Sequence, residues 1–381
     1  FSVINKTKTI FGDIYLKNIL NNPTKNTDIL KERQNILNKL DVNLANKLVE
    51  KLELIKELED DVLWILREKN PEEMKIIDSV YFTNKYLRML NSNEDILSLY
   101  SLFSIFFAPI YGVVSPIIFF IIPYVYLYFF AGIKFSFKTY FEIFKTSIFG
   151  GLNIFTSKKG GITKYFSVML SIIIYFQNFS NTIKVATSNY KTINSLHEKL
   201  NKLNKFVETY KQIYDLTKDI FKFDEPDIFC PRLSNQLFNT DPQLLSNKGK
   251  ILVTFKSVHG FEKNKYKSMF NLIGEVDSYV SIVTLFKEMT ENNYNICYTR
   301  FESKFNPEIK FTKLWHPYLS KSDKEVVCND IKIGGDTPNN IILTGPNAGG
   351  KSTFIKAISL SLLFSHTFGI SFSEEAFITP F

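Results

Sequence analysis

An unbroken run of uncharged residues at 96–133 limits what this chain can fold into more than any other feature. The run is 38 residues long and rich in Phe and Ile. About 20 apolar residues suffice for a helix to cross a bilayer, and the backbone must be helical there because lipid offers no hydrogen-bond partners. The run therefore predicts two short arms, 96–111 and 117–133, turning at Gly112 to Pro116 as a membrane hairpin. The alternatives are a re-entrant or interfacial pair, since the arms are slightly short, and the core of a soluble helical domain.

A second uncharged tract, residues 165–183, predicts a buried or interfacial helix, because it contains three polar amides: Gln177, Asn178 and Asn181. Two crossings at 113–133 and 166–183 would also return the chain to its starting side. They would carry six lysines across with one acid, Glu142, against the tendency of basic loops to stay inside. The hairpin predicted above is therefore preferred, since it keeps these lysines on the near side: Lys134, Lys138, Lys145, Lys158, Lys159 and Lys164.

Length and charge narrow the class of protein. The 381 residues suit two or three domains, and 46 basic against 38 acidic residues give a net charge of +8, which favours an anionic partner. Three cysteines, Cys230, Cys297 and Cys328, show no metal-ligand spacing and predict reduced thiols in an intracellular protein. Because the sequence starts at Phe1 and stops after a proline, we expect it to be part of a longer chain.

A glycine-rich loop matches the pattern G-x-x-x-x-G-K-[ST] at residues 345–352. In such loops, backbone N–H groups and the start of the next helix surround a phosphate. The flanks agree, because 341–343 predicts a short buried strand and 353–367 predicts a helix. Lys351 would reach the β- and γ-phosphates, and the Ser352 hydroxyl would bind Mg²⁺. The alternative is a chance match in a turn. The predicted phosphate-binding residues are Gly345, Pro346, Asn347, Ala348, Gly349, Gly350, Lys351, Ser352 and Thr353.

Four segments carry a family resemblance. Residues 344–354, TGPNAGGKSTF, resemble the loop of the MutS mismatch-repair family, which commonly reads TGPNMGGKST. Upstream, 315–317 (WHP) and 327–331 (VCNDI) resemble the family's HP and VPND elements, and 272–277 with Ser281 resembles the junction between its core and ATPase domains. The start of the chain is similar to the opening of the MutS core at Thr9, Gly12, Leu16, Pro23, Ile29, Arg33 and Gln34.

The resemblance implies a mostly α fold, a MutS-like helical core and lever, followed by the start of an α/β P-loop ATPase domain. The expected domains are the first part of the core at 1–95, an apolar insertion at 96–183, the lever and remaining core at 184–310, and the beginning of the ATPase domain at 311–381. The resemblance also implies ATP and Mg²⁺, ATP hydrolysis, mismatched or branched DNA as partner, and a homodimer or heterodimer of full-length chains.

The chain departs from the family pattern at several positions, and each departure limits what can be expected of the nucleotide site. Ala348 replaces the usual Met, and Val326 stands where an aromatic side chain often packs on adenine, so stacking is not expected there. The Walker B carboxylates are expected beyond residue 381, so no catalytic residue can be named and residues 1–381 alone should hydrolyse little ATP. His316 precedes a proline and predicts a structural turn in preference to a ligand.

The remaining segments predict long helices. Residues 27–90 have helical apolar spacing, with Asp28 as the first cap. Residues 193–214 carry a heptad seam, which predicts a helix packed on a partner helix and is similar to the MutS lever: Ile193, Leu196, Leu200, Leu203, Val207, Tyr210 and Tyr214. The neighbouring Lys199, Lys202 and Lys205 predict a solvated face, with DNA contact as the alternative.

Two functions follow from these observations. The first is a MutS-like ATPase that acts on mismatched or branched DNA in mismatch repair. The alternative is a membrane-tethered MutS-like ATPase, held through residues 96–133 with its ATPase on the cytoplasmic side, and coupled to a membrane or protein partner in place of mismatches.

Overall fold

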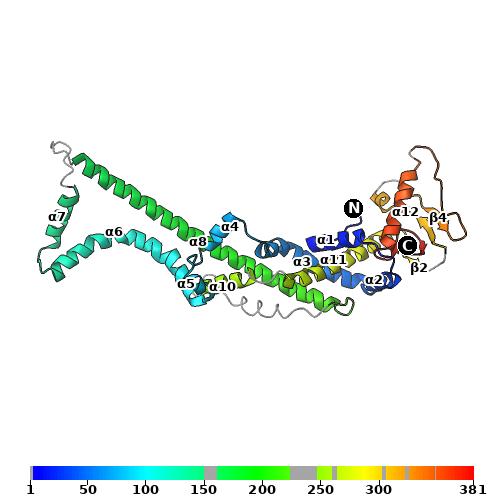
Figure 1. Ribbon diagram of the computed structural model, residues 1–381, viewed down its shortest axis with the longest axis horizontal. Helices are drawn as coiled ribbons and strands as arrows, with labels where there is room; N and C mark the ends of the chain where they lie inside the picture. The colour runs from blue at the N-terminus through cyan, green and yellow to red at the C-terminus, as the bar shows by residue number, and fades with distance from the viewer. Residues whose placement is uncertain are drawn as a thin grey trace. The chain divides into compact units, whose positions relative to one another are not determined.

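The computed structural model describes residues 3–149, 161–223, 247–259, 264–302, 306–321, 326–347 and 349–381. The chain divides into two compact units. Unit 1 comprises Phe1–Leu66, Lys202–Asn235 and Phe261–Phe381, and unit 2 comprises Arg67–Asn201 and Gln236–Gly260. Most of the described chain is helical, as predicted, and its strands all follow α11 (Figure 1).

Unit 1 begins with a group of helices. They are α1 (Ile10–Asn21), α2 (Thr27–Lys39), α3 (Val42–Leu66), the last turns of α8 (Gly161–Thr217) and α11 (Asn264–Glu291). The Asn26 side chain accepts from the backbone N–H groups of Asp28 and Ile29 and caps α2. The predicted cap at Asp28 is therefore wrong. Asp28 lies in the first turn instead, where its charge favours the positive end of the helix dipole.

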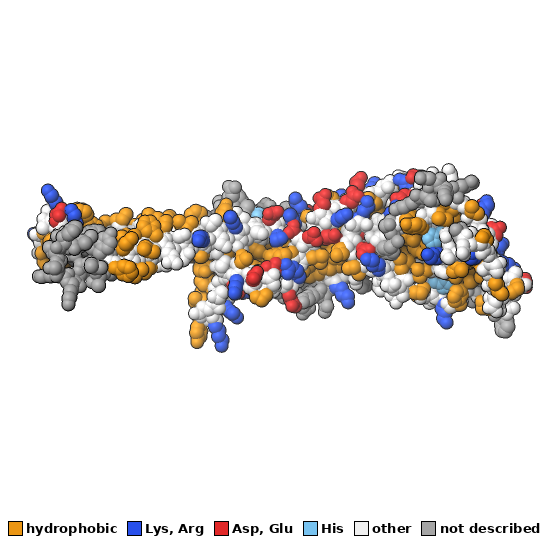
Figure 2. Space-filling view, turned by 90° about the horizontal axis from the view of Figure 1, so that it is seen from above, with side chains coloured by type: hydrophobic (Ala, Val, Ile, Leu, Met, Phe, Trp, Pro, Cys, Tyr) orange, Lys and Arg blue, Asp and Glu red, His pale blue; other side chains and the backbone are white. Residues whose placement is uncertain are grey.

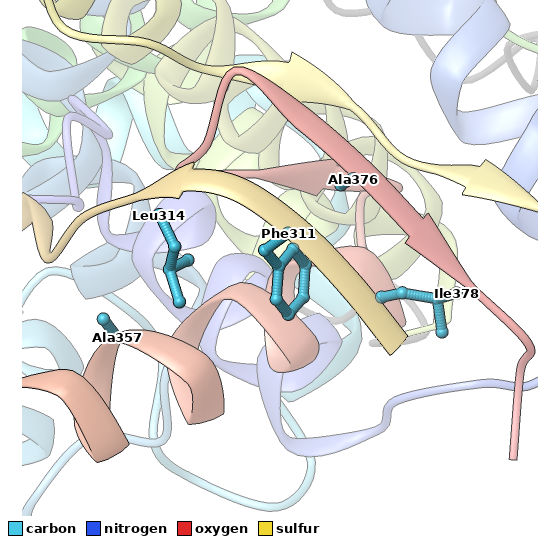
Figure 3. Packing of buried hydrophobic residues seen from close by; sticks show 5 residues of the cluster. All are labelled: Phe311, Leu314, Ala357, Ala376 and Ile378. Atoms are coloured by element: carbon cyan, nitrogen blue, oxygen red, sulfur yellow. The ribbon is translucent and has the colours of Figure 1, made fainter. Parts of the chain in front are cut away.

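A small sheet and one helix form the rest of unit 1. The strands β2 (Arg300–Phe301), β6 (Glu375–Ile378), β3 (Glu308–Leu314) and β4 (Asn329–Gly334) lie side by side in that order, and β1 (Cys297–Tyr298) pairs with β5 (Ile370–Ser371). Helix α12 (Lys351–Ser365) places Ala357 against Phe311 and Leu314 of β3 (Figure 3). This apolar contact fixes the helix that follows the glycine-rich loop.

The strand predicted at 341–343 is wrong. These residues form neither helix nor strand, and Ile341, Ile342 and Leu343 are 52%, 89% and 39% exposed. A strand needs the backbone of a neighbour, and among the described residues the sheet ends at β4 without pairing this segment.

Unit 2 is helical in the described residues. It contains α4 (Pro71–Asp78), the 3₁₀ helix η1 (Arg88–Ser92), α5 (Glu94–Leu102), the π-helix η2 (Phe103–Phe107), α6 (Ala108–Val125), the π-helix η3 (Tyr126–Phe130), α7 (Phe137–Phe149), the first part of α8, and α10 (Asn247–His259). Helix α10 lies closely on α5, because the Gly249 N–H donates to Ser98 Oγ at 3.1 Å and a Cβ on Gly249 would lie 1.8 Å from the Glu94 carbonyl oxygen.

The turn predicted at Gly112 to Pro116 is wrong, because the chain is helical without a break from Glu94 to Phe130. Pro116 and Pro123 lie inside α6. Gly112 serves a close helix contact in place of a turn: the Tyr175 hydroxyl of α8 donates to its carbonyl oxygen at 2.7 Å, and a Cβ there would lie 3.1 Å from the Phe179 ring. The glycine therefore favours packing between helices.

Helix α8 joins two features that the sequence presents separately. The heptad residues Ile193, Leu196, Leu200, Leu203, Val207 and Tyr210 are buried, as a packed seam requires. The apolar tract at 165–183 lies near the beginning of the same helix, and its described large apolar side chains are mostly exposed. Of the two alternatives predicted for it, a buried helix is therefore wrong and an interfacial helix stays a prediction.

Candidate nucleotide site

The glycine-rich loop ends where α12 begins. Gly350 is the N-cap of α12 with φ +82, a left-handed conformation that glycine adopts without steric cost, and it supplies no side-chain cap. The first N–H groups of α12 are therefore not bonded by a capping side chain, and they lie at the positive end of the helix dipole. This is the local geometry that an anion requires.

Lys351 closes the loop on itself. Its ammonium donates to the carbonyl oxygens of Gly345 and Pro346, each at 2.6 Å. The loop also holds itself through the Gly349 N–H, which donates to the Pro346 carbonyl at 3.2 Å. The cation is thus fixed beside the start of α12, where a bound phosphate would compete for it with the two carbonyl groups.

A pocket of about 600 Å³ lies beside this loop. It is lined by the loop and α12, by the start of η4 (Pro317–Lys321) and the turn before it, and by the approach to β4. Its lining residues are Leu314, Trp315, His316, Leu319, Val326, Val327, Asn329, Leu343, Thr344, Gly349, Gly350, Lys351, Thr353, Phe354 and Ala357. The segments at 315–317 and 327–331, which the sequence relates to the loop by resemblance alone, therefore share one pocket with it.

Only some of the predicted phosphate-binding residues line the pocket. Gly349, Gly350, Lys351 and Thr353 line the pocket, whereas Gly345, Pro346, Asn347 and Ser352 are exposed on the loop and at the start of α12 outside the described lining. Ala348 lies outside the described residues.

His316 is held as part of a turn. Its Nδ1 accepts from the Tyr318 N–H at 3.2 Å, and its carbonyl oxygen accepts from the Leu319 N–H at 2.9 Å. Burial lowers the pKa of His316 below its usual range, and the nearby Lys356 charge lowers it further. Both effects favour the neutral ring, and the two hydrogen bonds support a structural turn, although the ring also lines the pocket.

Asp330 has a role that sequence reasoning missed. Its Oδ1 accepts from the Lys313 N–H at 2.7 Å, at the irregularity in the pairing of β3 with β4 between Phe311 and Leu314. Lys313 has φ +47, which is uncommon for a residue with a side chain, and its ammonium pairs with Glu374 at 3.0 Å. The carboxylate thus fixes the bulge that directs Leu314 and Trp315 to the pocket.

Metal binding at this site would depend on the loop. No group of three or more His, Cys, Asp or Glu side chains gathers among the described residues. Mg²⁺ prefers six oxygen ligands, several of them water or phosphate. Ser352 is the hydroxyl at the start of α12 that would supply one, with nucleotide phosphates and water completing the set.

Comparison with known proteins gives the chain its family. No family model matches it. The MutS mismatch repair protein of Wolbachia pipientis is 22% identical over 256 residues, which are 63% of this chain and 28% of that protein. MSH3 of Debaryomyces hansenii is 26% identical over 193 residues, 50% of this chain and 17% of its own length. MSH7 of Arabidopsis thaliana is 39% identical over 67 residues, 16% of this chain and 6% of its own length.

Several MutS and MSH proteins match the chain at low identity over part of its length, which supports membership of the MutS family. The chain matches less than a third of the length of each of these MutS relatives. The segments that carry the MutS resemblance at its two ends meet inside unit 1. Asp277 of α11 accepts from the backbone N–H groups of Lys8 and Thr9, and Ser278 donates to the Gly12 carbonyl at 3.1 Å.

A second junction in this MutS chain joins α2 to the end of α12. The Arg33 guanidinium donates to the Thr367 carbonyl at 2.5 Å. The Gln34 amide donates to the carbonyl oxygens of Thr299 at 2.8 Å and Gly369 at 2.7 Å. The helix that starts at the glycine-rich loop therefore ends against the helical part of unit 1.

Proposed function

We propose that the chain is the core and nucleotide-binding part of a MutS-type ATPase that acts in DNA mismatch repair. The single observation that supports this most is the pocket, which brings the 315–317 and 327–331 segments to the loop at 349–353. Lys351 would pair with the β- and γ-phosphates, the N–H groups at the start of α12 would bind phosphate oxygens, and Ser352 would bind Mg²⁺. ATP hydrolysis is proposed for the full-length protein.

In this pocket the nucleotide base would pack against aliphatic side chains. Leu319, Val326 and Val327 line the pocket away from the loop, and Val327 is 74% exposed. Aliphatic contact stabilises a base through burial without the stacking geometry of an aromatic ring. We therefore assign most of the nucleotide affinity to the phosphates.

Replacing Lys351 tests the site. Lys351→Ala removes the ammonium that faces the β- and γ-phosphates, so affinity for ATP should fall by at least about tenfold, the usual scale for a lost charge-assisted bond. Equilibrium binding of a fluorescent ATP analogue to full-length protein measures this. Lys310→Ala, which removes an exposed lysine from β3, is the matched control and should leave affinity unchanged. Equal affinity of Lys351→Ala and the control would refute the assignment.

We propose DNA as a partner, in a dimer of full-length chains, on the basis of the family and the net charge of +8. Lys202 pairs with Asp61 at 2.7 Å and belongs to a solvated face, whereas Lys205 is exposed on the same helix. Phosphate contacts release counterions, so DNA affinity should fall steeply between about 50 and 200 mM salt.

Lys205→Glu tests one such contact by fluorescence anisotropy. It should weaken binding equally for matched and mismatched duplexes, because phosphates carry no sequence information. A salt-independent affinity, or one unaltered by this change, would count against DNA contact on this face.

A further inference from the structure

Large hydrophobic side chains cover η2, α6 and η3 on the outside. None of the residues of these three elements is buried. Figure 2 shows the hydrophobic side chains gathered along this part of unit 2. Those more than a third exposed are Phe103, Phe106, Phe107, Ile110, Tyr111, Val113, Ile117, Phe119, Ile121, Ile122, Val125, Tyr126, Phe129 and Phe130.

The exposed side chains cover more of the helix than a single narrow stripe. Neighbouring residues point about 100° apart on a helix, and the exposed set contains adjacent pairs such as Ile121 and Ile122. A helix that docks on one protein partner shows a single apolar stripe with polar residues opposite it, whereas a helix that is apolar all round is buried in a core or in lipid. Since this helix is not buried in the described protein, lipid is the environment that its surface fits.

The beginning of α8 has the same character. Its exposed large side chains include three consecutive isoleucines, Ile172, Ile173 and Ile174, and the first buried residue among its described side chains is Ala186. The polar residues of this tract are uncharged, and its amide side chains, Gln177, Asn178 and Asn181, are exposed. Two described helices are long and apolar enough to span a membrane: Glu94–Phe130, and Tyr266–Glu291, which has 72% of its most apolar window buried and is a core helix of unit 1. The beginning of α8 is not one of them, and its assignment to lipid rests on its exposed apolar side chains.

The two exposed tracts touch at one point. They run in opposite directions, and Tyr175 and Phe179 of α8 meet Gly112 of α6. The segment from Phe103 to Pro123 is about 30 Å long as a helix, which is the thickness of the hydrocarbon layer.

The ends of the tracts suit a membrane boundary. At one end Tyr124, Tyr126 and Tyr128 are followed by Lys134, the arrangement of aromatic and basic residues found at lipid headgroups. There the Tyr140 hydroxyl of α7 donates to the Phe120 carbonyl at 2.8 Å. At the other end α5 is packed on α10 through Gly249, so the apolar surface begins where protein packing ends.

We infer that α6, with η2 and η3, and the beginning of α8 form an antiparallel helical pair that crosses a lipid bilayer twice. The pair puts α7 on the far side of the bilayer, and the residues before Phe103 and after Ala186 on the near side. The lysines on the far side, Lys134, Lys138 and Lys145 among them, oppose the positive-inside tendency. This inference is independent of the nucleotide site.

Two arginines in the exposed surface test the lipid contact. In full-length protein, Ile117→Arg with Phe119→Arg changes side chains that are 55% and 70% exposed, so no protein packing is lost. The wild type should stay in the membrane pellet after carbonate washing and float with liposomes. The double variant should lose about tenfold or more of its floating fraction, because a charge in mid-bilayer is costly.

Tyr86→Arg with Met89→Arg is the matched control, since these side chains are 83% and 76% exposed outside the tract. The control should float like the wild type. Flotation separates inserted protein from aggregates, which sediment. Wild-type protein that is soluble without detergent, including a soluble dimer that the arginines dissociate, would overturn the inference, as would a double variant that floats like the wild type.

Labelling determines the number of crossings. Cys328 is exposed in unit 1, and Ser136→Cys would place a thiol beyond the aromatic end of α6. In protein with Cys230 and Cys297 replaced by Ser, a membrane-impermeant maleimide should reach these two thiols from opposite sides of sealed vesicles. Labelling of both from the same side would show that the pair does not cross.

Discussion

The Asp277 carboxylate joins the start of the chain to α11. Its carboxylate is buried and accepts from the Lys8 N–H at 3.0 Å and from the Thr9 N–H and hydroxyl at 2.8 and 2.7 Å. A Cβ on Gly12 would lie 2.0 Å from its Oδ2, so glycine is required for α1 to approach α11 this closely. The sequence shows Gly12 and Asp277 only as matches to a family pattern, and their contact supplies the physical reason for both.

The protonation of Asp277 should make unit 1 sensitive to pH. Burial raises the pKa of Asp277 to about 6, although hydrogen bonds from Lys8 and Thr9 lower it in part. Its unfolded value is about 3.9, so the folded state binds the proton more tightly. The resulting stability is complete below about pH 4 and is lost as the pH rises through about 6, a change on the order of 2–3 kcal/mol.

Asp277→Asn cannot titrate and provides the comparison. Urea unfolding can be followed by tryptophan fluorescence, which reports on unit 1 because Trp64 and Trp315 both lie there. Between pH 4 and pH 7 the wild type should lose stability relative to the variant by roughly the amount that linkage gives. Parallel stability curves for the two proteins would contradict the raised pKa.

At the scale of elements, α12 is held at both ends. Its start carries the glycine-rich loop, and its end meets α2 through Arg33 and Gln34. Gln34 is the more specific of the two contacts, because its amide reaches both Thr299 and Gly369.

Removing the Gln34 amide should destabilise unit 1. In Gln34→Ala the Thr299 carbonyl loses its side-chain partner, while the Gly369 carbonyl still accepts from the Thr299 N–H. The expected loss is about 1–3 kcal/mol in urea unfolding followed by tryptophan fluorescence. Asn35→Ala, exposed on the same helix, should change stability by less than about 0.5 kcal/mol. Equal effects of the two changes would show that the contact contributes nothing.

Elements were predictable where local pattern decides them. The helix after the loop and the heptad seam of α8 follow from apolar spacing, which burial of one face enforces. The prediction of a strand at 341–343 was wrong because a strand needs a neighbouring strand to pair with, and local sequence does not show whether one is there. The prediction of a turn at Gly112 was wrong because glycine also permits close contact between helices, as the bond from Tyr175 shows here. The pocket wall at Leu319 has no local pattern, since only folding brings it to the loop.

At the scale of the whole molecule, unit 1 contains the proposed nucleotide site and unit 2 contains the exposed helices. The proposed nucleotide site and the proposed membrane crossing can therefore be tested independently. ATP affinity of Lys351→Ala tests only the first, and liposome flotation tests only the second.

The antiparallel contact at Gly112 has a consequence for how such a protein would encounter DNA. If the pair crosses a bilayer as inferred, the chain is confined to the plane of the membrane. Diffusion there is two-dimensional, so a duplex would have to approach the lipid surface before the protein could bind it.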